Sequence, residues 1–377
     1  NSREGRYSIV NNQAWKAAVG LLFLFVLLQT GGVSAGTAAE DRTSVGNMEV
    51  SALPEWPVTV EKSGPTLLFS DSPEMVANDG ILYQDTVQGD VRLFYHHVND
   101  TKNWKRLAIV VENPGPGAAQ LQIQRAGQAG PSQDYLAVGK EVQARYFQGA
   151  GARKVSIPAG AAAEILSGEN GVSFRYNELL TGMMDLKVDR PVRIKIVFCP
   201  VGAQAAEFAS WAPILPADQY RMRGTFLQAD RLLTAKNTYN PLDDNTVAVT
   251  LADNSQDTFV KGIDATDGTE TVNYGNYGVI YQLRVPTANS GGLALYLSPQ
   301  GGEYAGFLGV RYQKPAELVL PTPMGQTAFG AVGDFRQISL VGRYNSGQDL
   351  FVRFSPPGGS NLPVRLVLSP YWRSGGA

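Results

Sequence analysis

Short stretches of alternating apolar and polar residues recur along most of the chain, and they predict β-strands. In Ala119–Gly127, Leu121 and Ile123 would share one face, with glutamines on the other. The segment Arg190–Pro200 alternates branched apolar residues with Arg and Lys in the same way. Arg106–Asn113 is almost continuously apolar, which is typical of a strand buried on both faces. Turn residues return about every 8 to 12 positions, a spacing that favours antiparallel sandwiches or barrels.

The second half of the chain follows the same order of segments as the first. Val91–Gly117 and Gly278–Gly302 each hold a β-rich run, a polar turn, an apolar run and a Pro/Gly turn. Each half then closes on a similar strand, at Arg190–Pro200 and Leu362–Trp372. Repeated order at wide spacing indicates two copies of one folding unit. We therefore expect an all-β protein with two tandem antiparallel β-sandwich domains, Ig-like or jelly-roll-like.

The same patterns suggest domain boundaries. We expect a signal or anchor segment at 1–39, an extended lead-in at 40–65, a first sandwich at 66–200, a linker at 201–224 and a second sandwich at 225–377. Only Ser132–Gln148 has helical character, with Ser132 in a capping position. Because Gly139 weakens that helix, a helix and an irregular segment both stay open there.

The N-terminal region has the layout of a secretory signal. Basic residues precede the apolar run Ala17–Leu28, and small residues follow it. Cleavage could occur after Ala35 or after Ala39. An uncleaved membrane anchor is the alternative, although the run is shorter than the roughly 20 residues that a span needs. The sequence thus predicts a secreted or cell-surface protein, which would contact a membrane only through 1–39 and only if that segment is not cleaved.

Composition narrows the partners. The formal net charge is -2 and no basic block is present, so nucleic acid is an unsuitable partner. The single cysteine, Cys199, cannot form an internal disulfide, and we expect an inert, partly buried thiol. An exported chain without disulfides must be stabilised by core burial, which favours a bacterial cell surface over a eukaryotic secretory product.

Residues suited to catalysis are scarce. The two histidines, His96 and His97, are adjacent on a predicted strand and would point to opposite faces, one of them near solvent. They cannot share a metal ion or form a relay, and no Gly-x-Ser-x-Gly elbow is present. Gly115–Gln120 is interpreted as a hairpin turn rather than a dinucleotide loop, and Gly139–Lys140 lacks the rest of a phosphate loop. We expect no catalytic, cofactor-binding or metal-binding residue and no cofactor.

Two weaker patterns remain. The acidic segments Asn240–Asn245 and Asp264–Glu270 could gather oxygens for Ca²⁺ or serve as solvated turns. Tyrosines in the second half could stack on sugars if exposed, or pack in the core: Tyr274, Tyr277, Tyr281, Tyr296, Tyr304, Tyr312 and Tyr344. Paired carboxylates for glycoside hydrolysis depend on three-dimensional separation and stay open.

Four strings carry a family resemblance: GILYQDTVQGDVRLFYHHVN, RMRGTFLQADR, GNYGVIYQL and PPGGSNLPVRLVLSP. They resemble secreted proteins of Gram-positive, spore-forming bacteria labelled copper amine oxidase N-terminal or stalk domain proteins. The resemblance covers most of residues 65–372 and implies an extracellular or envelope factor, here without the stalk domain. In Thr271–Tyr277 the quinone-forming motif of the oxidases is a near miss, because Gly275 replaces the acid and Thr271 is one position too close. Two opposed histidines also cannot supply the three copper ligands that such oxidases need.

The sequence therefore favours an exported structural or interaction protein of the cell envelope, without catalytic activity. Its partners would be cell-wall polymer, extracellular glycan or copies of itself, with segment 40–65 donating a strand to a neighbour. An extracellular carbohydrate-binding module is the alternative. A hydrolase that uses carboxylates alone is the third hypothesis.

Overall fold

The computed structural model describes residues 49–166, 172–289 and 291–371. Contacts divide the chain into two compact units, 1–42 and 43–377, and all the described residues belong to the second. The expected signal or anchor at 1–39 lies outside the described residues. Among the helices of the described part, none has the length and apolarity that crossing a membrane requires.

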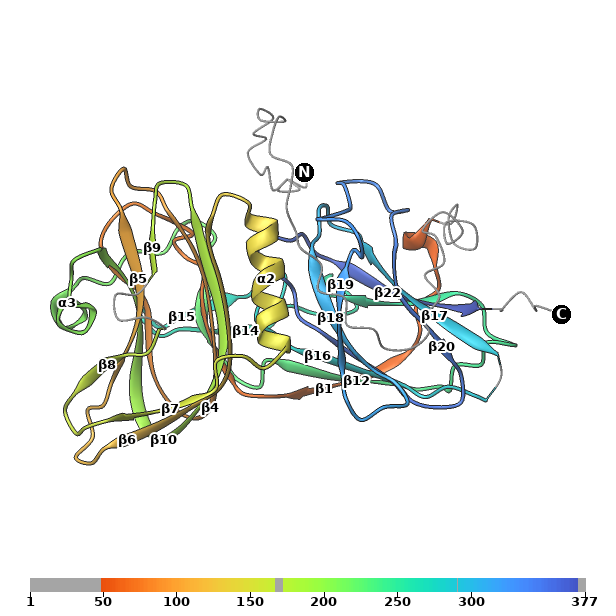
Figure 1. Ribbon diagram of the computed structural model, residues 1–377, viewed down its shortest axis with the longest axis horizontal. Helices are drawn as coiled ribbons and strands as arrows, with labels where there is room; N and C mark the ends of the chain where they lie inside the picture. The colour runs from red at the N-terminus through yellow and green to blue at the C-terminus, as the bar shows by residue number, and fades with distance from the viewer. Residues whose placement is uncertain (1–48, 167–171, 290, 372–377) are drawn as a thin grey trace, which may run out of the picture. The chain divides into compact units, whose positions relative to one another are not determined.

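The described chain is all-β, with its strands gathered into three sheets (Figure 1). The twelve-stranded sheet contains β2 (Thr66–Ser70), β3 (Met75–Val76), β4 (Gly80–Asn99), β5 (Lys105–Glu112), β6 (Ala119–Ser132), β7 (Arg153–Ile157), β8 (Ala162–Glu164), β9 (Val172–Phe174), β10 (Leu179–Pro200), β11 (Arg223–Phe226), β14 (Lys261–Asp264) and β15 (Thr269–Val272).

Apart from β1, the two smaller sheets are built from strands after residue 229. The six-stranded sheet has the order β1 (Val58–Ser63), β12 (Asp230–Ala235), β16 (Tyr281–Val285), β21 (Leu350–Phe354), β18 (Gly306–Arg311) and β19 (Leu318–Thr322). The four-stranded sheet has the order β13 (Val247–Leu251), β22 (Val364–Tyr371), β17 (Gly292–Pro299) and β20 (Ser339–Asn345). The helical elements are η1 (Val50–Ala52), α2 (Tyr135–Phe147) and α3 (Ala205–Trp211).

The alternation seen in the sequence matches the burial. In β6, Leu121 and Ile123 are buried and the glutamines between them are exposed. Strand β5 is buried on both faces because α3 covers its outer face, where Ala108 and Val110 pack with Phe208. The periodicity of each strand therefore reflects how many of its faces are covered.

The turn at Gly115–Gln120 is not the hairpin that we expected. Strands β5 and β6 do not pair with each other: β10 pairs with β5 through residues 193–200 and with β6 through residues 179–188. The two strands therefore follow one another along the same edge of β10. Asn113 fixes the turn, since its Nδ2 donates to the carbonyls of Gly117 at 2.8 Å and Ile157 at 2.9 Å.

The internal repeat is only partly reflected in strand pairing. The antiparallel pair β5–β10 has its counterpart in β17–β22. The counterpart of β4 is β16, however, and β16 lies in a different sheet from β17. The two halves thus share one antiparallel strand pair, β5–β10 in the first and β17–β22 in the second, but the strands next to these pairs differ.

Strands also pair across the boundaries that the sequence suggested. Strand β1, from the expected lead-in, pairs with β12, so that Val60 lies opposite Leu233. Strand β11 pairs with β2 and, on its other side, with β14. Most pairs are antiparallel as expected, but β2–β4, β3–β4 and β12–β16 are parallel.

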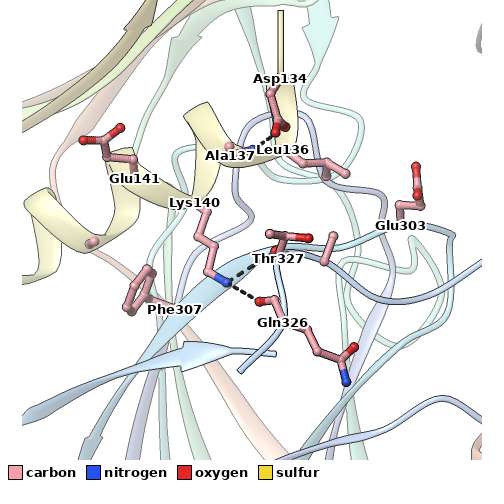
Figure 2. A pocket seen from close by; sticks show the side chains of 11 residues that line it. Asp134, Leu136, Ala137, Lys140, Glu141, Glu303, Phe307, Gln326 and Thr327 are labelled. Carbon is pink, nitrogen blue, oxygen red and sulfur yellow. Dashed lines mark hydrogen bonds between the residues drawn. The ribbon is translucent and has the colours of Figure 1, made fainter. Parts of the chain in front are cut away.

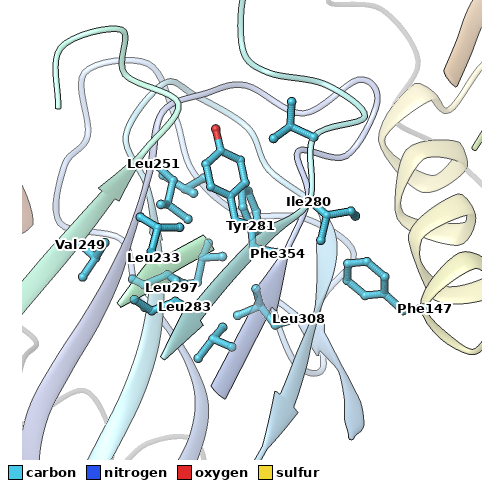
Figure 3. Packing of buried hydrophobic residues seen from close by; sticks show 14 of the residues in the cluster. Phe147, Leu233, Val249, Leu251, Ile280, Tyr281, Leu283, Leu297, Leu308 and Phe354 are labelled. Atoms are coloured by element: carbon cyan, nitrogen blue, oxygen red, sulfur yellow. The ribbon is translucent and has the colours of Figure 1, made fainter. Parts of the chain in front are cut away.

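Helix α2 joins the sheets. Its N-cap is Asp134, whose carboxylate accepts from the Ala137 N–H at 3.0 Å, rather than Ser132, which ends β6. The helix packs on β6 and β10 and also on β18 and β19. Phe147, at its end, belongs to the same apolar cluster as Ile280 and Leu308 (Figure 3). The helix is therefore shared by the large sheet and the six-stranded sheet.

Candidate functional site

An open groove of about 570 Å³ runs between α2 and the strands and loops around β18 and β19 (Figure 2). The helix supplies one wall, and the opposite wall comes from residues 303–307 and 326–328. The lining residues are Asp134, Leu136, Ala137, Lys140, Glu141, Ala144, Glu303, Phe307, Gln326, Thr327 and Ala328. The groove brings charged side chains from the two walls together, as ligand-binding sites often do.

Lys140 bridges the two walls of the groove. Its Nζ donates to the carbonyl oxygens of Gln326 at 3.2 Å and Thr327 at 3.3 Å (Figure 2). The ammonium also lies 5.9 Å from the centre of the Phe307 ring. Burial lowers the pKa of Lys140 from its usual value. Lys140 thus lies in a helix rather than in a phosphate loop, and it ties α2 to the loop after β19.

The carboxylates of the groove are engaged separately. Asp134 caps α2, and Glu141 is paired with Arg145 one helical turn along. Glu303 stands on the opposite wall, and Figure 2 shows the three carboxylates apart from one another. Glycoside hydrolysis needs two carboxyl groups facing each other across the substrate bond. This arrangement favours a structural role for the three acids.

The two histidines are both buried, which corrects the expectation that one lies near solvent. The Pro73 carbonyl oxygen lies 2.9 Å from Nδ1 of His97, and the Ser70 hydroxyl lies 2.9 Å from Nε2. Since a carbonyl can only accept, Nδ1 carries the proton and Nε2 accepts from Ser70. His96 stacks on Phe94, and its Nδ1 is buried without a hydrogen-bond partner. Burial lowers the pKa of His96 to about 3 and of His97 to about 4.

Acidic groups gather beside the histidines. Burial, with Glu74 and Asp218 nearby, raises the pKa of Asp71 well above its usual range. Burial and Asp218 also raise the pKa of Glu74, whose Oε1 lies 4.0 Å from Nε2 of His96. Asp218 accepts hydrogen bonds from the Ser72 hydroxyl at 2.9 Å and the Glu74 N–H at 3.0 Å. These contacts fasten the loop after β2 to the segment before β11.

A buried ion-pair network joins the large sheet to the six-stranded sheet. Arg92 on β4 pairs with Asp185 on β10 at 2.8 Å and with Asp230 at the start of β12. It also donates to the Gly278 carbonyl at 3.1 Å, and Tyr146 of α2 donates to Asp185 at 2.6 Å. Burial raises the pKa of Asp230, although Arg92 acts in the opposite direction. The network holds β4, β10, α2 and β12 in one fixed arrangement.

The carboxylates of the acidic segments considered for Ca²⁺ are hydrogen-bonded or ion-paired to other residues of the protein. In the first, Asp244 accepts from the Asn240 N–H at 2.6 Å. In the second, the buried Asp264 pairs with Arg223 at 2.8 Å, and Asp267 pairs with Arg221 at 2.5 Å. Within residues 49–166, 172–289 and 291–371, no group of three or more His, Cys, Asp or Glu could hold a metal ion.

The other predicted residues are mostly structural. Cys199 is buried beneath α3, and burial raises its pKa to about 11. Of the seven tyrosines considered above for sugar stacking, only Tyr274 is exposed, at 42%. In the segment resembling the oxidase motif, Asn276 donates to the hydroxyl of Tyr281 at 2.7 Å and Tyr277 donates to the Ser360 carbonyl at 2.8 Å. That segment is a hydrogen-bonded turn.

Further aromatic rings are exposed at positions that sequence reasoning missed. Trp104 is 52% exposed, Tyr176 is 56% exposed and Trp211 is 68% exposed. Trp104 and Tyr176 belong to the polar turns NDTKNWK and RYNE, between strands. A large ring inside a turn of otherwise polar residues was the available signal, since a turn offers a ring little to pack against.

Comparisons with known proteins give no family. No family model matches the chain, and no curated protein matches it. Solved structures give only distant likenesses. CUB1-EGF-CUB2 of rat MASP-1 has a TM-score of 0.20 at 7% identity, over 76% of this chain and 97% of that chain. Lactobacillus farciminis oxalate decarboxylase in a formate complex has a TM-score of 0.17 at 10% identity, over 83% of this chain and 88% of that chain.

Proposed function

We propose that this chain is an exported, non-catalytic interaction protein of the bacterial cell envelope. The apolar run Ala17–Leu28, with basic residues before it and small residues after it, motivates the export. The resemblance to secreted proteins of Gram-positive bacteria points to the same compartment. The proposal assigns the described β-rich region to binding or structural work on wall polymer, glycan or further copies.

The observation that carries the proposal is that polar and ionisable side chains in the interior are bonded to other residues of the fold. His97 is held between Ser70 and Pro73, and Arg92 is held between Asp185 and Asp230. Buried groups that are hydrogen-bonded or ion-paired to one another hold neighbouring elements together, and they are not available to bind a substrate. Together with strands that pair across both halves of the chain, they support a rigid scaffold that presents its surface.

The proposal does not include strand donation from segment 40–65. Residues 58–63 pair with β12 of their own chain, which is the arrangement that argues against donation to a neighbour. Residues 40–48 lie outside the described residues. Assembly of copies would need another sheet edge.

Cell fractionation and a wall-binding assay test the proposal together. The full chain is expressed with its N-terminal segment in a Gram-positive host, and external protease is added to intact cells. Purified protein is then sedimented with isolated cell walls, and soluble products are measured. We expect surface exposure and co-sedimentation without product release. Cytoplasmic retention, or product release that Lys140→Met or Glu303→Gln abolishes, would overturn the proposal.

A further inference from the structure

Two exposed aromatic rings stand on neighbouring turns at one end of the twelve-stranded sheet. Trp104 immediately precedes β5, and Tyr176 follows β9 by two residues. Strands β5 and β9 lie side by side (Figure 1) and pair antiparallel, with Lys105 opposite Phe174. The next opposed positions by this register are Trp104 and Arg175. We call Trp104, Arg175 and Tyr176 the ring surface.

The turns that carry the ring surface are held rigidly. Asn99 is fully buried, and its Nδ2 donates to the carbonyls of Asn103 and Phe174, each at 2.9 Å. The Asn177 N–H donates to the Asn99 carbonyl at 2.7 Å, so one asparagine fixes both turns. The Tyr135 hydroxyl at the start of α2 donates to the Asn177 carbonyl at 3.2 Å. Rings on such turns lose little conformational entropy when they bind a ligand.

Trp104 is oriented by a cation. The Arg175 guanidinium carbon lies 4.5 Å from the centre of the Trp104 ring. The contact covers part of the indole, and half of the side chain stays open to water. An exposed ring held in one orientation is the kind of platform on which a flat, weakly polar ligand stacks.

We propose that the ring surface binds a neutral polysaccharide built of β-linked pyranose rings, an inference that rests on the proposed envelope function. The C–H face of such a sugar stacks on Trp104 or Tyr176, while Arg175 and the amide of Asn103 donate to its hydroxyls. Charge near the rings is balanced, with Lys102 and Arg175 against Asp100 and Glu178. A balanced surface matches a neutral polymer better than a polyanion.

The test compares three ring variants in one assay. Wild type, Trp104→Ala, Tyr176→Ala and Trp211→Ala are sedimented with cellulose, chitin and peptidoglycan, and affinities are measured for cellohexaose and chitohexaose. Trp211 is the matched control, since it is exposed but belongs to α3, where its ring packs on Phe208 at 4.8 Å, and not to either of the two turns. We expect each ring-surface variant to weaken binding about tenfold and Trp211→Ala to leave it unchanged.

A ring-restoring variant separates stacking from loss of fold. Trp104→Phe keeps an aromatic face and should keep most of the affinity, while all variants should unfold at the wild-type urea midpoint. Failure of wild type to bind any of the polymers overturns the inference. Binding that survives both Trp104→Ala and Tyr176→Ala also overturns it but leaves the envelope function standing. Release of reducing sugar would instead contradict the non-catalytic function.

Discussion

Replacing His96 by Leu should make the stability of the folded chain less sensitive to acid. His96 is 6% exposed, and its native pKa of about 3 lies far below its ordinary value of 6.5. In the unfolded chain the imidazole takes up a proton as the pH falls through about 6.5, whereas in the fold it stays neutral. The stability linked to this group is therefore complete above pH 6.5 and declines as the pH falls toward the native pKa.

The magnitude follows from the two pKa values. Each pH unit below 6.5 costs about 1.4 kcal/mol for a histidine that stays neutral in the fold. At pH 5 the cost is about 2 kcal/mol for His96 and about the same for His97, whose native pKa is about 4. The chain contains no other histidine. Asp71 and Glu74, with raised pKa values, act in the opposite direction but are present in both proteins.

The assay is urea unfolding of wild type and His96→Leu at pH 8 and pH 5. Leucine has a similar size and lies against the same Phe94, and Nδ1 has no hydrogen-bond partner to lose. The difference in unfolding free energy between the two pH values should be about 2 kcal/mol smaller in the variant. Equal pH dependence in the two proteins would show that His96 is protonated in the fold, through Glu74 or solvent, and would refute the reasoning.

Two further substitutions test the contacts that join the sheets. Arg92→Met should lower the free energy of unfolding, measured in urea, by about 3 kcal/mol, because it leaves Asp230 buried without its cation. The control is the exposed pair Arg284–Asp349, where Arg284→Met should cost less than about 1 kcal/mol. Equal losses would contradict a structural role for the buried network. Gly139→Ala should lower the thermal midpoint despite the better helix propensity of alanine, because its Cβ would clash with the Gly358 carbonyl oxygen. Gly202→Ala, with nothing within 4 Å, should be neutral, and a stabilised Gly139→Ala would mean that α2 lies farther from that loop.

The local sequence pattern predicts the all-β class, because a strand buried on one face alternates apolar and polar residues and a strand buried on both faces is continuously apolar. The strands β5 and β6 follow this rule closely, with continuous burial in β5 and alternation in β6. The sequence does not decide between a helix and an irregular segment at α2, because Gly139 disfavours the helix. The structure explains that glycine by the Gly358 carbonyl, a contact with a loop more than 200 residues away.

The pairing of strands that are far apart in the chain could not be predicted from the sequence. Nothing in the composition of β1 specifies β12 as its neighbour, since edge strands carry few side-chain constraints on their partner. The histidines show the same limit. Strand alternation places the two side chains on opposite faces, but the cover comes from residues far away in the sequence: Gly358 lies beside His96, and Ser70 and Pro73 contact His97. The rings at Trp104 and Tyr176 lie in turns, whose residues give no periodic pattern that would predict exposure.

The pairing of β1 with β12 has a consequence for synthesis. A nascent chain that has emerged from the ribosome as far as residue 200 holds β1 to β10, yet the partner of β1 and the outer neighbour of β2 are still to be made. Such open edges readily pair with other chains. Productive closure must therefore wait until β11 and β12 have emerged. The incomplete polypeptide is therefore more prone to aggregation than the completed protein. Folding after translation would suit this topology better than folding during translation.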